Sequence, residues 1–206
     1  ALPSAGKVVA SKREVKPVTG VVENIFKRKQ ETPKSTAYMM WHNTTMPYNT
    51  KNALCASIAG QILSMEYLDK IREKESAAYS VGANGGCSVG KDNYRMFQIF
   101  AYCPMKPEKK EVAMRIMNDE VKNLANTCDP AKLAKCKEYM IKQHADAQKS
   151  NSYWLSIINQ YNNLGIDQYT DYLKTLESLT PQDICNYMKE FNKSGNHITV
   201  AMLPEE

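Results

Sequence analysis

The sequence lacks the long apolar segments by which membrane and exported proteins are recognised. No run approaches the roughly 18–20 consecutive apolar residues that a membrane-spanning helix needs. The first 30 residues contain no apolar signal-peptide core, so we expect no signal peptide there. Because the sequence starts at Ala1 and not at Met, we expect a processed product or a piece of a longer chain.

Catalytic motifs are equally scarce. Neither a Gly-x-Ser-x-Gly elbow nor a P-loop is present. The histidines are His42, His144 and His197, and none has a partner at the spacing of a helical zinc pair. His144 with Asp146 comes nearest, but catalytic zinc takes three protein ligands. We therefore expect structural, hydrogen-bonded histidines, no metal site and no complete catalytic constellation within this chain.

Cys-x-x-Cys pairs are absent, although the chain has six cysteines. An even number is compatible with disulfides. However, Cys55, Cys136 and Cys185 lie in apolar helical patterns, where a free thiol acts as a small hydrophobic side chain. The sequence favours reduced, buried thiols over a bridged scaffold and leaves the redox compartment open.

Composition and charge indicate a globular chain with a basic beginning. The 206 residues are 43% hydrophobic and 24% charged, which excludes collagen, coiled coil and wholesale disorder. Residues 1–35 carry eight Lys or Arg and three Glu, which accounts for the whole net charge of +5. A basic arm can bind nucleic acid, but Phe26 is the only aromatic residue available there for base stacking. We interpret residues 1–17 as a solvated linker, without nucleic-acid binding, ahead of one domain over residues 18–206. A free-standing module that uses this arm stays an alternative.

Residue patterns in the first half predict strands around one long helix. Apolar residues at helical spacing, among them Leu54, Ile58 and Ile62, predict a helix from Lys51 to about Lys74. Residues 35–45 carry consecutive apolar side chains from Tyr38 to Trp41, so both faces of a strand there would be apolar. This pattern predicts a central strand covered on both faces. The other expected elements are a short extended piece at 7–10, strands at 20–29, 77–83 and 94–102, and a hairpin turn at Asn84-Gly85-Gly86.

The second half predicts helices and one closing strand. Asp129-Pro130 and the Thr180 to Asp183 segment have the composition of helix starts, and Gly165 that of a helix end. The expected helices cover residues 107–124, 130–149, 151–164, 169–176 and 181–191, and the strand covers residues 197–203. Strands at both ends with helices between them predict an α+β fold, a mostly antiparallel sheet with helices packed on one face.

The segment from Tyr67 to Gly82 holds two side chains suited to ligand contact. Arg72 and Tyr79 are separated by a chain reversal between the long helix and the expected strand at 77–83. Both can then project from the same end of the sheet. Arginine offers five N–H donors and tyrosine one phenolic donor, so together they can hold peptide carbonyl oxygens. Each also has an ordinary structural explanation, because arginine favours a helix C-terminus and tyrosine packs well in strands.

The same region carries a resemblance to a known family. Residues 53–82 read ALCASIAGQILSMEYLDKIREKESAAYSVG. They resemble the C-terminal-half signature of pitrilysin/insulinase-type zinc metallopeptidases, in which an Arg is followed seven residues later by a Tyr. The closing segments TPQDICNYMKEF and HITVAML are also similar to the end of such domains. The resemblance covers about residues 18–204 and implies a mitochondrial processing peptidase-like metallohydrolase fold.

This resemblance implies the non-zinc, C-terminal domain of a bacterial zinc endopeptidase. The family's zinc motif, His-x-x-Glu-His, is absent, so zinc is expected in an N-terminal half on the same chain or a partner chain. By analogy, Arg72 holds a substrate backbone carbonyl, and Tyr79 donates to the scissile carbonyl as it becomes an oxyanion. The segment alone is then inactive, its substrate is a peptide, and the resemblance suggests the periplasm. The alternative is a non-catalytic scaffold or peptide-binding subunit of the same family.

Overall fold

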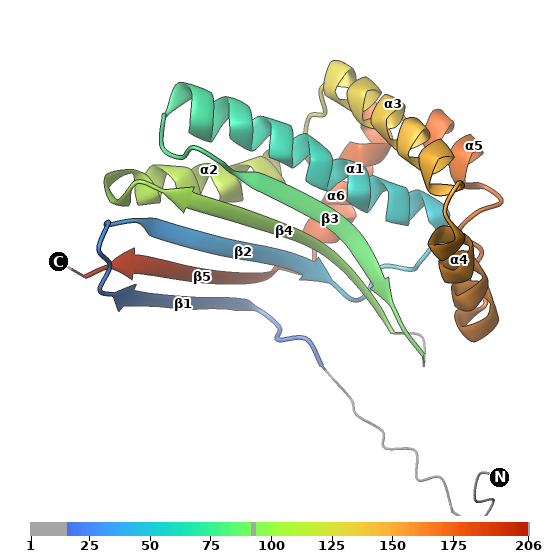
Figure 1. The fold of residues 1–206 in the computed structure, drawn as a ribbon, viewed down its shortest axis with the longest axis horizontal. Helices are drawn as coiled ribbons and strands as arrows, with labels where there is room; N and C mark the ends of the chain where they lie inside the picture. Colours follow the sequence, from blue (N-terminus) through green and yellow to red (C-terminus); the bar gives the residue numbers. More distant parts are fainter. Residues whose placement is uncertain (1–15, 92–93, 206) are drawn as a thin grey trace, which may run out of the picture.

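The fold is one five-stranded sheet with helices on one side of it (Figure 1). The computed structural model describes residues 16–91 and 94–205, so the extended piece expected at residues 7–10 lies outside the described part. The strand order is β1-β5-β2-β4-β3. The strands are β1 (Val21–Arg28), β2 (Ser35–Asn43), β3 (Gly82–Val89), β4 (Arg95–Met105) and β5 (Asn196–Pro204).

Pairing within the sheet is mostly antiparallel, as expected. Only β1 and β5 run parallel, while β2 pairs antiparallel with both β4 and β5, and β3 pairs antiparallel with β4. The central place of β2 is confirmed, but the expectation that both its faces are covered is wrong. Met39 is 2% exposed whereas its neighbour Tyr38 is 44% exposed, because the helices cover only one face of the sheet.

Helices supply the second layer of the fold. The long helix is α1 (Thr50–Tyr67), continued without a break by a π-helical segment, η1 (Leu68–Lys74). A 3-10 turn, η2 (Pro107–Lys109), leads into α2. The remaining helices are α2 (Lys110–Asn123), α3 (Pro130–Ala147), α4 (Asn151–Leu164), α5 (Tyr172–Ser178) and α6 (Pro181–Asn192). In Figure 1, α2 and α6 lie behind the sheet, and α3, α4 and α5 gather near the N-terminal end of α1.

The Asn84-Gly85-Gly86 segment forms no hairpin turn. Asn84, Gly85 and Gly86 lie inside β3, which pairs with β4 as far as Val89, and the N–H of Gly90 donates to Tyr94 O at 3.0 Å. A Cβ on Gly85 would lie 1.9 Å from Ala56 O, and one on Gly60 would lie 2.0 Å from Gly85 N. The glycine therefore lets the backbones of α1 and β3 touch, which is a packing role and not a turning role.

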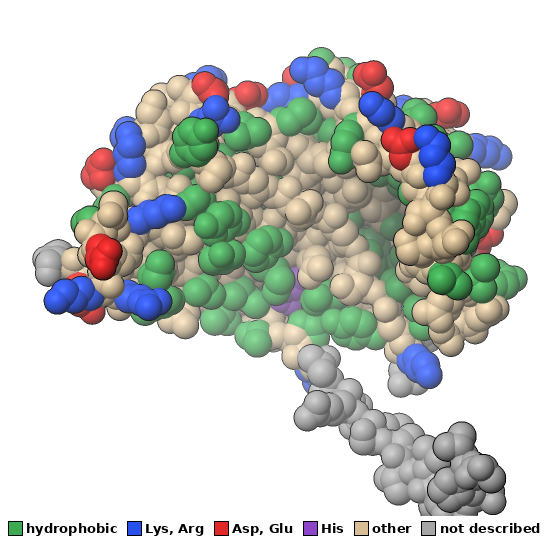
Figure 2. Space-filling view, in the orientation of Figure 1, with side chains coloured by type: hydrophobic (Ala, Val, Ile, Leu, Met, Phe, Trp, Pro, Cys, Tyr) green, Lys and Arg blue, Asp and Glu red, His purple; other side chains and the backbone are tan. Residues whose placement is uncertain are grey.

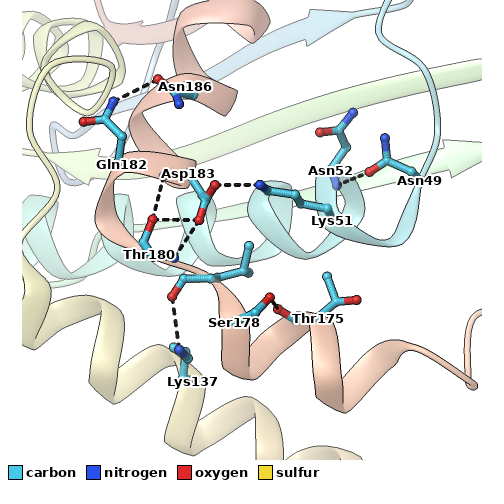
Figure 3. A network of polar contacts seen from close by, with 11 residues as sticks. Asn49, Lys51, Asn52, Lys137, Thr175, Ser178, Thr180, Gln182, Asp183 and Asn186 are labelled. Atoms are coloured by element: carbon cyan, nitrogen blue, oxygen red, sulfur yellow. Dashed lines mark hydrogen bonds and ion pairs between the residues drawn. The ribbon is translucent and has the colours of Figure 1, made fainter.

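Capping interactions fix where α1 and α6 begin and join them to each other (Figure 3). Thr180 and Asp183 form a complete capping box at the start of α6, as the sequence predicts. Asn49 caps α1 by accepting a hydrogen bond from Asn52 N at 2.7 Å. Lys51 Nζ lies 2.6 Å from Asp183 Oδ1, so one carboxylate caps α6 and binds α1. This ion pair ties together two helices that are far apart in the sequence.

All six cysteines are free thiols, and five of them are buried. Burial raises the pKa of Cys55, Cys103 and Cys128 to about 12. These thiols therefore stay protonated at neutral pH and contribute to packing. No helix within residues 16–91 and 94–205 is long and apolar enough to cross a membrane.

Candidate functional site

Arg72 lies on a helical segment that is held firmly in place. The π-helical geometry of η1 is uncommon and frequently marks functional sites. Ile71 is fully buried beside it. Lys70 Nζ lies 2.6 Å from Glu120 Oε2 on α2, and Asp69 Oδ2 lies 2.7 Å from Lys132 Nζ on α3. These contacts hold η1 against α2 and α3. The Arg72 side chain extends from this anchored segment and is about half exposed.

Tyr79 lies in the loop between η1 and β3. The expectation that it belongs to a strand is wrong, because β3 begins only at Gly82. Ala77 and Ala78 are buried, and Ala77 N–H donates to Ile71 O while its carbonyl accepts from Lys106 N, both at 2.9 Å. These bonds occupy the N–H and C=O groups of Ala77, which are then not available for pairing with a neighbouring strand. The loop is thus anchored on both sides, while the Tyr79 side chain is 87% exposed.

The structure brings Arg72 and Tyr79 together. Arg72 Cζ lies 5.5 Å from the centroid of the Tyr79 ring, which is cation–π distance. Arg72 Nε also lies 3.3 Å from Glu73 Oε1. Among residues 16–91 and 94–205, nothing donates to or accepts from the Tyr79 hydroxyl. The pair thus presents a phenol and a guanidinium to solvent, both available as hydrogen-bond donors.

The described residues do not form a metal centre. No group of three or more His, Cys, Asp or Glu suited to a metal lies within that part of the chain. The three histidines are apart: His42 Nε2 contacts Val18 O at 2.9 Å, His197 stacks on Trp41, and His144 lies in an aromatic cluster. A catalytic zinc, which takes three protein ligands, does not fit these residues.

The open face of the sheet carries aromatic side chains that sequence reasoning missed. Tyr38 lies 4.7 Å from Tyr102 and 5.6 Å from Phe100, measured between ring centroids. Figure 2 shows hydrophobic side chains gathered on this face. A cavity of about 640 Å³ extends from Phe100 and Tyr102 across the start of β3 to α1 and α3. The sequence of β2 carries apolar residues on both faces, so its pattern gave no signal that one face is open.

Comparisons with known proteins identify the family. The model of the peptidase M16 inactive domain matches residues 3–140. No curated protein sequence matches the chain. Among solved structures, the periplasmic protease PqqL from Escherichia coli is similar, with a TM-score of 0.75 and 19% identity over 98% of this chain and 22% of that one.

Two other solved structures share the fold. The ferredoxin protease FusC E83A mutant, in complex with Arabidopsis ferredoxin, has a TM-score of 0.70 and 17% identity over 94% of this chain and 22% of that one. A chain of Complex III2 from Candida albicans, with Inz-5 bound, has a TM-score of 0.67 and 14% identity over 94% of this chain and 48% of that one. The chain thus spans less than half the length of each. By its family match and its fold, the chain belongs to the M16 peptidases, the pitrilysin/insulinase-type family, and corresponds to their inactive C-terminal domain.

Proposed function

We propose that this chain is the substrate-contacting, non-zinc domain of an M16 zinc endopeptidase. The observation that carries the proposal is the pairing of Arg72 with Tyr79 on an anchored but exposed loop. Exposure of the Tyr79 ring is hard to explain by stability. Its cation–π contact with Arg72 gains about 0.5–1 kcal/mol at an exposed site, which is less than the roughly 1.5–3 kcal/mol that burial of a large apolar side chain gains. Contact with a ligand explains the exposure.

Each of the two side chains has a role in this proposal. The Arg72 guanidinium holds a backbone carbonyl of the peptide, for which its fixed N–H donors are suited. The Tyr79 hydroxyl donates to the scissile carbonyl oxygen as negative charge develops on it. A donor held in place before the reaction stabilises such an oxyanion, and its loss costs roughly 10²–10³ in rate.

The zinc and the general base belong to another part of the enzyme in this proposal. The proposal assigns the metal to an N-terminal half, on the same polypeptide or on a partner chain, in keeping with the absence of a His-x-x-Glu-His motif from this sequence. The chemistry that zinc supplies there is the activation of water. The open face of the sheet, with Tyr38, Phe100 and Tyr102, forms one wall of the chamber in which the peptide lies.

The alternative is a non-catalytic scaffold or peptide-binding subunit. The likeness to a chain of Complex III2 favours it, because that chain is named as part of a complex and not as a protease. The two proposals differ in whether a His-x-x-Glu-His motif accompanies this domain. Its presence in the complete reading frame or in a co-purifying chain supports the peptidase, and its absence from both supports the scaffold.

Replacing Arg72 by alanine tests the proposal in the assembled, zinc-containing enzyme. We expect kcat/KM on several peptides to fall by at least tenfold, with KM and kcat both affected, because the substrate loses a positioning contact. Steady-state kinetics on three unrelated peptides measures this.

A matched control is Arg115→Ala, which removes an exposed arginine from α2. We expect this variant to cleave like the wild type. Equal kcat/KM for Arg72→Ala and Arg115→Ala would contradict the role of Arg72 but would leave the family assignment intact.

A further inference from the structure

A second cavity lies at the opposite end of α1 from Arg72. It measures about 400 Å³ and lies between the first half of α1 and helices α3, α4 and α5. The rise of 1.5 Å per helical residue puts roughly 25–30 Å between Ala53 in its wall and Arg72. Figure 1 shows the two ends of α1 on opposite sides of the molecule. The cavity is therefore separate from the Arg72–Tyr79 pair.

His144 is the polar side chain built into this cavity. It is only 6% exposed. Its ring stacks on Tyr172 at 4.2 Å between centroids with an interplanar angle of 9°, and Tyr153 meets it edge-on at 5.9 Å. The Tyr153 hydroxyl lies 3.5 Å from Nδ1, and no residue in the described part of the chain bonds Nε2. Nε2 is not among the buried unpaired atoms of the described residues, so it is open to solvent, and His144 belongs to the cavity lining. A ligand in the cavity can therefore replace water as the hydrogen-bond partner of Nε2.

The lining of the cavity is uncharged. Its apolar and aromatic surface comes from Leu54, Met140, Ile157 and three tyrosines, and its other polar groups are amides and hydroxyls. Burial raises the pKa of Tyr48, Tyr153 and Tyr172 and lowers that of His144, so all four groups are neutral near pH 7. Arg95 Cζ lies 5.9 Å from the centroid of the Tyr48 ring, but Arg95 is not part of the lining. A charged ligand would therefore lose its hydration with no charged side chain in the lining to pair with. A neutral ring would gain aromatic contacts on several sides.

We propose that this cavity binds the phenol ring of a tyrosine side chain in a peptide, with the phenol hydroxyl bonded to His144 Nε2. A hydroxyl both donates and accepts, so it matches Nε2 in either tautomer of the ring, whereas an indole N–H only donates. The choice of a peptide as the source of the phenol rests on the proposed function. Binding of the ring itself does not rest on it.

Binding to the isolated chain tests the proposal without any protease assay. The probes are N-acetyl-L-tyrosinamide, N-acetyl-L-phenylalaninamide and p-cresol, and the readout is the NMR shift of the Met140 methyl group and the His144 ring protons. We expect saturable shifts with the tyrosine probe, and roughly three- to tenfold weaker binding of the phenylalanine probe, because it lacks the hydroxyl. We also expect p-cresol to bind more weakly than N-acetyl-L-tyrosinamide.

Two variants isolate the role of His144. His144→Phe keeps the stacking on Tyr172 but removes the nitrogen, so the tyrosine and phenylalanine probes should bind equally. His197→Phe, the control, changes a histidine that stacks on Trp41 elsewhere and should leave the preference unchanged. Absence of saturable shifts in the wild type, or a preference that survives in His144→Phe, would overturn the proposal. Tighter binding of p-cresol than of N-acetyl-L-tyrosinamide would contradict the part of the proposal in which the phenol ring belongs to a peptide. None of these results bears on Arg72 or Tyr79.

Discussion

At the scale of single residues, exposure and burial alternate sharply where function is proposed. Ala78 is 8% exposed and Tyr79, the next residue, is 87% exposed. The same contrast separates buried Ile71 from half-exposed Arg72. A stable loop needs its buried alanines, and the exposed neighbours are then free for contact with another molecule. Neighbouring residues thus hold the backbone at Arg72 and Tyr79 in place, and the side chains of these two residues are not needed for it.

Asp183 is a residue whose charge stabilises the fold. The Lys51 ammonium and the Thr180 hydroxyl lower the pKa of its carboxyl from 3.8 to about 2. Replacing it with asparagine removes the ion pair and weakens the capping box. We expect the free energy of unfolding of Asp183→Asn at pH 7 to fall by about 1–2 kcal/mol. Urea unfolding at several pH values measures this loss.

The pH dependence of that loss follows from the sign of the pKa shift. A carboxyl with a depressed folded pKa stabilises the fold above its unfolded pKa, and this stabilisation is lost as the pH falls through the folded value. The difference between wild type and Asp183→Asn should therefore shrink between pH 4 and pH 2. Asp171→Asn is the control, because Asp171 precedes α5 without a side-chain capping bond. A difference that stays constant over this pH range would contradict the role of the charge.

At the scale of elements, the contact between α1 and β3 depends on two glycines. Gly85→Ala would place a methyl group 1.9 Å from Ala56 O, so the helix and the strand would have to separate. We expect a loss of about 3 kcal/mol or more in the free energy of unfolding. Chemical denaturation monitored by circular dichroism gives this value, and failure to fold would be the extreme of the same effect.

Gly86→Ala is the matched control for Gly85→Ala. No atom lies within 4 Å of a Cβ built at Gly86, and the two residues are neighbours in the same strand. We expect this variant to stay within about 1 kcal/mol of the wild type. Equal stability of the two variants would contradict the close approach of α1 and β3.

The same elements show what the sequence could predict and what it could not. Local chemistry gave the helix starts at Asp129-Pro130 and Thr180, the helix end at Gly165 and the periodic helix from residue 51, because these depend on neighbouring residues. The Asn84-Gly85-Gly86 segment was misinterpreted as a turn because glycine serves turns and close packing alike. Only the tertiary contact with Gly60 distinguishes the two roles. The exposed face of β2 was missed for a similar reason, because periodicity does not reveal that helices cover one face alone.

At the scale of the whole molecule, the two proposed contact sites lie at opposite ends of α1. The sequence alone pointed to Arg72 and Tyr79, because their spacing resembles a family pattern. It gave no indication of the His144 cavity, whose walls come from four helices, from Tyr48 ahead of α1 and from Gln168 between α4 and α5. The open sheet face and the exposed apolar residues of α4, Leu155, Ile158 and Tyr161, are further surfaces without cover in the described part of the chain. Under the proposed function, the peptide meets the open sheet face, and the exposed apolar side chains of α4 are available for contact with another part of the enzyme.

The most direct test of the central proposal is the turnover of Tyr79→Phe in the assembled zinc enzyme. The substitution removes one hydroxyl from an exposed ring, so the fold should persist while kcat falls by roughly 10²–10³. Tyr161→Phe, which removes a hydroxyl from another exposed tyrosine on α4, should leave kcat unchanged. Near-normal turnover of Tyr79→Phe, with wild-type stability, would contradict the assignment of Tyr79 as the donor to the scissile carbonyl.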